Sequence, residues 1–137
     1  MPETMRANSK LLLSVTGVVE AATGLALLLV LALLIEVLLG AAPDTPVDMT
    51  VARVAGAAVL ALAVACWLGR HEVGGKAVRG LVSAMLLYNV AVTAILAFSW
   101  LRHGISGIAF WPVVVGHVGL AVWCVACGLA SPRIADR

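Results

Sequence analysis

The chain has 137 residues, of which 63% are hydrophobic and only 12% are charged, and its mean hydropathy is +1.10. A soluble domain of this size needs a polar surface, which nine basic and seven acidic residues cannot supply. The formal net charge of +2 and the lack of any basic run argue against a nucleic-acid-binding protein. The composition therefore predicts a single membrane domain over residues 1–137.

The first apolar segment follows the basic sequence MPETMRANSK and covers about residues 11–39. It is much longer than the apolar core of a signal peptide and has no clear cleavage site, so we expect a retained membrane helix. Because about 20 residues cross a bilayer, this helix should tilt or project beyond the hydrocarbon region.

Three further apolar segments are long enough to span a membrane, over about residues 51–69, 78–101 and 108–130. Breaks that contain glycine, proline or charged residues separate them: GAAPDTPVD, GRHEVGGK and RHGISG. Such short connections predict an all-α protein in which four helices form an up-down-up-down bundle. Seven of the nine Lys and Arg residues flank one side of this bundle, so we expect both termini to be cytoplasmic.

Polar residues from three of the four segments fall at a common depth. At about 1.5 Å per residue, Glu20 lies about 15 Å beyond Lys10, near the centre of a bilayer. Tyr88 and Asn89 reach the same depth in the third segment, and His117 lies slightly further outward in the fourth. Ionisable residues are costly at this depth and usually functional, so these four residues predict a ligand or proton site.

The first segment also carries a stripe of small and hydroxylated residues that share one helical face with the glutamate. The stripe consists of Thr16, Gly17, Glu20, Thr23 and Gly24. Such a stripe is typical of close helix contacts in lipid, so it should turn Glu20 towards the inside of the bundle. Thr93 shares a face with Asn89, and we expect Thr16, Thr23 and Thr93 to support the site.

Two protonation states would relieve the cost of burying Glu20. The carboxyl group is either protonated and donates a hydrogen bond, or ionised against a protonated His117. Tyr88 and Asn89 would fill the remaining hydrogen bonds. In the alternative interpretation, this network binds nothing and only holds the helices in register.

A second pair of charged residues is expected at the outer interface. Glu36 lies about 39 Å from Lys10 along a continuous helix, and Arg53 opens the second span on the same side. A salt bridge across the first loop is the simpler interpretation, and an anion-attracting mouth is the alternative.

The three cysteines lie in apolar segments, which argues against the disulfide framework of a secreted protein. Cys124 and Cys127 form a CxxC pair near the end of the fourth segment, where we expect small apolar fillers and not a redox centre. Cys66 and His117 fall at different depths, so no metal site is predicted.

The order of these features resembles the DoxX-like family of small four-helix bacterial membrane proteins. The resemblance covers about residues 14–128 and depends on Glu20 in GVVEAATGLALLL and on Arg53 and Gly56 at the start of ARVAGAAVLALAVACWLGR. It implies a multi-pass protein of the bacterial cytoplasmic (inner) membrane. Some family members are associated with quinone-linked sulfur oxidation or thiol redox balance, and the family supplies no agreed catalytic residues.

Taken together, the residues favour a membrane protein that binds a small apolar or quinone-like molecule, or relays a proton, at its inner polar residues. Glu20 would carry the proton with His117 as its partner, and Tyr88 and Asn89 would orient the ligand. The alternatives are an accessory or assembly subunit, and a minimal proton-coupled small-molecule transporter. No motif indicates an enzymatic reaction. No cofactor is predicted, and a bound quinone or lipid, a homo-oligomer and a partner subunit all stay open.

Overall fold

The computed structural model describes residues 3–72 and 75–130, and these fold into five helices. The helices are α1 (Glu3–Leu29), α2 (Leu31–Leu39), α3 (Pro46–Gly69), α4 (Lys76–His103) and α5 (Phe110–Ala130). The predicted all-α fold is confirmed. The four longer helices, α1, α3, α4 and α5, are each long and apolar enough to cross a membrane, as the four apolar segments predicted.

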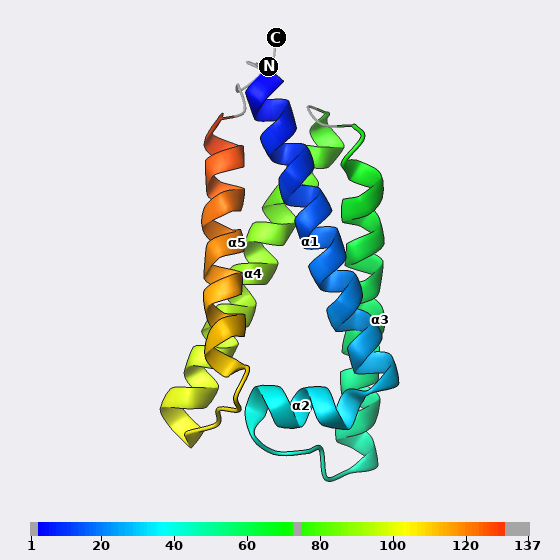
Figure 1. Ribbon diagram of the computed structural model, residues 1–137, viewed down its shortest axis with the longest axis vertical. Helices are drawn as coiled ribbons and strands as arrows, with labels where there is room; N and C mark the ends of the chain where they lie inside the picture. The colour runs from blue at the N-terminus through cyan, green and yellow to red at the C-terminus, as the bar shows by residue number, and fades with distance from the viewer. Residues whose placement is uncertain (1–2, 73–74, 131–137) are drawn as a thin grey trace.

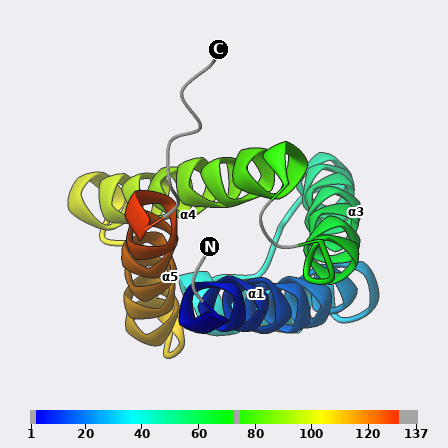
Figure 2. The same cartoon turned by 90° about the horizontal axis from the view of Figure 1, so that it is seen from above.

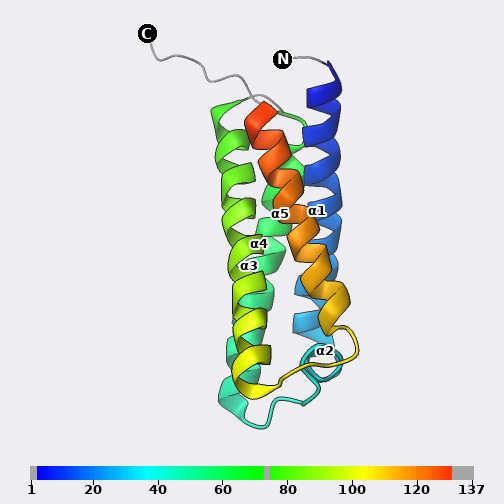
Figure 3. The same cartoon turned by 90° about the vertical axis from the view of Figure 1, so that its left-hand side faces the viewer.

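The prediction of one continuous first helix over residues 11–39 is wrong. The helix breaks at Val30, whose backbone angles are φ −131° and ψ 37°, and α2 then lies across the end of the bundle (Figures 1 and 3). The Val30 N–H still donates to the Ala26 carbonyl at 2.9 Å, and the Val30 carbonyl accepts from the Leu34 N–H at 3.1 Å. The chain therefore turns without leaving these backbone groups unpaired.

The segment before α5 holds α2 in place. The N–H groups of Gly107 and Ala109 donate to the carbonyls of Leu38 and Val37 at 2.9 and 3.0 Å. These two carbonyls lie in the last turn of α2, where carbonyl groups have no hydrogen-bond partner within the helix. Gly107 has to be a glycine because an added Cβ atom would overlap the Val37 carbonyl. After α2 the chain turns at Gly40, whose φ of 82° is the left-handed conformation that glycine adopts most readily.

The long helices pack as two pairs, α1 with α3 and α4 with α5. Further contacts between α1 and α5 and between α3 and α4 join these pairs into a ring, which Figure 2 shows from above. The end of the bundle at which α1 ends and α3 begins is covered by α2, and we call it the α2 end (Figure 1).

Glycines set the close approach of α1 to α3. A Cβ atom on Gly24 would lie 2.8 Å from the Gly56 carbonyl oxygen, and one on Gly56 would lie 2.7 Å from the Leu27 Cβ. Neither distance leaves room for a methyl group. The small-residue stripe of the first segment therefore packs against α3 around these two glycines.

The main cluster of buried apolar side chains lies towards the end of the bundle opposite α2. They come from all four long helices: Leu12, Leu13, Cys66, Val78, Val82, Met85, Cys124 and Cys127. All three cysteines are free thiols packed among aliphatic side chains, as their positions in apolar segments predicted. This core borders the polar residues of α1 and α4, because Tyr88 packs against it.

Candidate functional site

Glu20 is the most deeply buried ionisable group of the candidate site. Its side chain is only 1% exposed although it lies in the middle of α1. The Tyr88 hydroxyl on α4 donates a hydrogen bond to Glu20 Oε2 at 3.1 Å. The second carboxyl oxygen, Oε1, is buried and has no hydrogen-bond partner among the described residues.

Asn89, the next residue on α4, is fully buried and bonded at both ends of its amide. Its Nδ2 donates to the Met85 carbonyl at 2.7 Å, and its Oδ1 lies 2.8 Å from His117 Nδ1 on α5. Since a carbonyl can only accept, the amide nitrogen must face Met85, and the amide oxygen must face the histidine. His117 therefore carries a proton on Nδ1, which leaves Nε2 as its second hydrogen-bonding atom.

An aromatic contact connects these two hydrogen-bonded pairs. The rings of Tyr88 and His117 meet edge to face, with centroids 5.8 Å apart and planes inclined by 72°. The residues that the sequence placed at a common depth thus lie together, although they come from α1, α4 and α5. We call Glu20, Tyr88, Asn89 and His117 the polar cluster.

The expected pairing of Glu20 with His117 is not what the structure shows. Glu20 bonds to Tyr88, and His117 bonds to Asn89. Counting residues along each helix gives a depth but not the direction in which a side chain points around the bundle. The hydroxyl of Tyr88 faces the glutamate while its ring meets the histidine, so the described side chains do not form a continuous hydrogen-bonded path between the two.

The three threonines predicted to support the site differ in their contacts. Thr93 donates from Oγ1 to the Asn89 carbonyl at 2.8 Å, one turn away on α4. Thr16 is buried and Thr23 is partly buried on α1. Within the described part of the chain, neither threonine forms a hydrogen bond with the polar cluster. The small-residue stripe therefore contributes to helix packing and not to the hydrogen bonds of the site.

The predicted outer salt bridge is not formed in this structure. Glu36 lies on α2 and Arg53 lies in the second turn of α3, and both side chains are exposed. No ion pair joins them within residues 3–72 and 75–130. The break at Val30 explains the difference, because it turns Glu36 onto a helix that crosses the bundle instead of continuing along α1.

Cys66 is a neighbour of the site that the sequence did not assign to it. Its thiol on α3 is fully buried, and its Cβ atom would lie 3.6 Å from a Cβ atom added to Gly17, one turn before Glu20 on α1. Its position in the second apolar segment does not by itself place it beside Glu20. That placement also requires the packing register of α1 against α3. Among the described residues, no group of three or more His, Cys, Asp or Glu is arranged to hold a metal ion.

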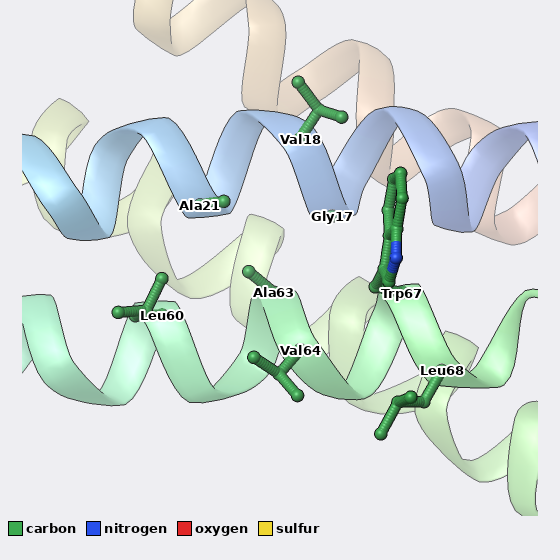
Figure 4. A pocket seen from close by; sticks show the side chains of 8 residues that line it. All are labelled: Gly17, Val18, Ala21, Leu60, Ala63, Val64, Trp67 and Leu68. Atoms are coloured by element: carbon green, nitrogen blue, oxygen red, sulfur yellow. The ribbon is translucent and has the colours of Figure 1, made fainter.

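A separate groove lies between α1 and α3 and has a volume of about 360 Å³ (Figure 4). Its lining is entirely apolar and consists of Gly17, Val18, Ala21, Leu60, Ala63, Val64, Trp67 and Leu68. None of the polar cluster belongs to this lining. We call it the α1/α3 groove, and the sequence did not predict it.

Comparisons of the chain with protein-family models, with curated proteins and with solved structures gave no match. The resemblance to the DoxX-like family therefore stays a prediction that depends on Glu20, Arg53 and Gly56. In the structure these positions differ in kind: Glu20 belongs to the polar cluster, Gly56 allows the close contact with α1, and Arg53 is exposed on α3.

Proposed function

We propose that this chain is a DoxX-like, multi-pass protein of the bacterial cytoplasmic membrane that binds a small, largely apolar molecule at the polar cluster. The observation that supports this proposal is Glu20 Oε1, a buried oxygen without a hydrogen-bond partner among the described residues. An unsatisfied buried polar group costs about 1–3 kcal/mol, and more when it is charged. A ligand that bonds to Oε1 would remove this cost.

The chemistry of the carboxyl group defines the class of ligand. An ionised Oε1 accepts a hydrogen bond from a hydroxyl group, and a protonated Oε1 donates one to a carbonyl group. A quinone or quinol offers these two groups on an apolar ring. Tyr88 would hold the other carboxyl oxygen in place, and His117 Nε2 would be a second polar contact.

Proton relay by the protein alone has less support than ligand binding. Tyr88 donates to Glu20, but only its ring contacts His117. A proton that moves between the glutamate and the histidine would therefore need a ligand or solvent hydroxyl between them. We favour binding, with proton exchange as a property of the bound molecule.

The proposed orientation has an up-down-up-down order of the four spans, with both termini in the cytoplasm. It is supported by the seven basic residues that the sequence places on the side of the termini and of the 69–76 loop, against Arg53 and Arg102 on the other. The polar cluster would then lie near the bilayer midplane, where an ionisable group is usually functional.

A binding experiment with a short-chain quinone analogue tests the proposal on the purified protein. We expect Glu20→Gln to weaken binding by about tenfold or more, because the hydrogen bond to a carboxyl group is lost or altered. Its unfolding temperature without ligand should stay close to that of the unsubstituted chain, since Gln has nearly the same shape. Binding that is unchanged in Glu20→Gln would overturn the proposed site.

Ser83→Ala is a suitable control for the same titration. Ser83 is exposed on α4 and its hydroxyl bonds only to the Arg79 carbonyl of its own helix, at 3.0 Å. The Ser83→Ala variant should bind the analogue as the unsubstituted chain does. If neither the unsubstituted chain nor Ser83→Ala binds any quinone analogue, the ligand-binding function is wrong for this class of molecule.

A second candidate function is that of a membrane assembly subunit. Gly116 and Gly119 lie three residues apart on α5, and a Cβ atom on either would meet open space. Such small residues allow another helix to approach closely in lipid. For this function, Gly119→Leu should release a copurifying partner, while Gly80→Leu at a similarly open position on α4 should not.

A further inference from the structure

The α1/α3 groove has the form of a channel open on one side. Figure 4 shows Gly17 and Ala21 on α1 facing α3, with the Trp67 ring standing between the two helices at one end and Leu60 lying towards the other. The rim is accessible, since Val64 is 53% exposed. An apolar channel of this kind takes a hydrocarbon chain and offers nothing to a polar molecule.

The length of the groove fits part of a lipid acyl chain. Its lining on α3 runs from Leu60 to Leu68, which is about 12 Å along the helix axis at 1.5 Å per residue. The small side chains of Gly17, Ala21 and Ala63 provide the space between the two helices.

A cation lies at the Trp67 end of the groove. The Arg70 guanidinium stacks over the Trp67 ring, with its Cζ 3.2 Å from the ring centroid, and its Nε donates to His71 Nε2 at 2.9 Å. No acidic side chain among the described residues pairs with it. The terminal nitrogens of an arginine form paired hydrogen bonds with phosphate, so this end of the groove is suited to an anionic headgroup.

The packing register brings a second cation to the same end. Gly24 lies against Gly56 and Gly17 lies against Ala63, and Leu13 reaches Gly69, so α1 and α3 run in opposite directions. Continuing this register by less than one turn places Lys10 near the level of Arg70. Lys10 is exposed, and it precedes Gly17 by seven residues, which puts it on the groove face of α1.

We propose that an anionic phospholipid occupies the α1/α3 groove, with one acyl chain along the groove and its phosphate against Arg70 and Lys10. This site is independent of the polar cluster, because the two share no lining residue. An uncharged or zwitterionic lipid fits the same channel but gains less from the two cations.

Competition between two lipids, followed by native mass spectrometry of the full chain in detergent, tests the proposal. Phosphatidylglycerol and phosphatidylcholine with the same acyl chains are supplied in equal amounts. We expect retention of phosphatidylglycerol to be about 25-fold greater, since each of the two basic groups contributes about fivefold towards an anionic lipid. Arg70→Gln should lower this preference to about fivefold, because Lys10 remains. Equal retention of both lipids, or an unchanged preference in Arg70→Gln, would overturn the proposal.

Two further variants locate the lipid. Arg53→Gln removes the same charge from the other end of α3 and should keep the preference. Val64→Phe fills the groove from its exposed rim and should lower the retention of both lipids. If the chain instead forms dimers that Val64→Phe separates, a second copy occupies the groove, and the lipid site is wrong.

Discussion

Asn89 organises the polar cluster because both ends of its amide are used. One end donates to the Met85 carbonyl within α4, and the other faces His117 on α5. The amide thereby orients the imidazole ring and determines which of its nitrogens carries a proton. Replacing one member of such a buried network is costly in free energy. The partner that remains loses its hydrogen bond, and no water molecule is there to replace it.

Asn89→Leu should therefore destabilise the protein. We expect a loss of about 1–3 kcal/mol in the free energy of unfolding, because the Nδ1–H of the partly buried His117 loses its acceptor. Unfolding in mixed micelles with increasing denaturing detergent would measure it. Thr93→Val removes only a bond within α4 and should cost less. Equal losses in the two variants would show that the bridge to His117 contributes little.

At the level of elements, the close contact of α1 with α3 depends on two glycines. Gly24 and Gly56 face each other across the interface, and a methyl group on either would meet the opposing helix at under 3 Å. In lipid, where burying apolar side chains between helices brings little gain, such close packing is a main source of helix association. The contact also positions Glu20, which lies one turn from Gly24 on α1.

Gly24→Ala should loosen this contact. We expect the free energy of unfolding to fall by about 1–3 kcal/mol, the usual cost of inserting a methyl group into a well-packed interface. Gly116→Ala is the matched control, because it makes the same change on α5 at a position with open space. The control should be neutral or stabilised by up to about 1 kcal/mol from its higher helix propensity. A similar loss in both variants would contradict the role assigned to Gly24.

The second element that needs explanation is α2, because the sequence around Val30 contains neither glycine nor proline. Nothing local in LLLVLALLIEV indicates a break, and a continuous helix was the reasonable prediction. The break depends on distant partners, the N–H groups of Gly107 and Ala109, which satisfy the last carbonyls of α2. A contact between segments some 70 residues apart cannot be deduced from local periodicity.

Gly107→Ala tests whether these partners hold α2 across the bundle. An added methyl group overlaps the Val37 carbonyl, so the hydrogen bonds of Gly107 and Ala109 should weaken. We expect hydrogen exchange of the backbone amides in α2 to become about tenfold faster, which corresponds to about 1.4 kcal/mol. Ser106→Ala alters the neighbouring residue without this overlap and should leave exchange unchanged. Unchanged exchange in Gly107→Ala would mean that α2 is held by its apolar contacts alone.

At the scale of the whole molecule, composition and helical periodicity sufficed for the four long helices and for the level of the polar cluster. Depth counting brought Glu20, Tyr88 and Asn89 together correctly because rigid helices keep a constant rise per residue. It failed for the partner of Glu20, since the rotation of each helix about its own axis depends on interhelical packing. The groove and the position of Glu36 were missed for the same reason: both depend on how helices meet.

The distribution of basic residues makes one prediction about the whole molecule, namely which loops face the cytoplasm. Asp44, between α2 and α3, and Glu72, between α3 and α4, are both exposed and lie in loops at opposite ends of α3. Each can be replaced by cysteine in a chain whose three buried cysteines have been changed to alanine. A membrane-impermeant maleimide then reports which loop is outside.

We expect Asp44→Cys to react in intact cells, since the loop between α2 and α3 has no Lys or Arg residue and should lie on the outer side. Glu72→Cys lies beside Arg70 and Lys76 and should react only after the membrane is permeabilised. The same background chain without an added cysteine controls for nonspecific reaction. Labelling of Glu72→Cys alone in intact cells would show the opposite orientation. Arg70 and Lys10 would then lie against the outer leaflet. Anionic lipid would then have to be recognised there, so this measurement also decides which leaflet supplies the occupant of the α1/α3 groove.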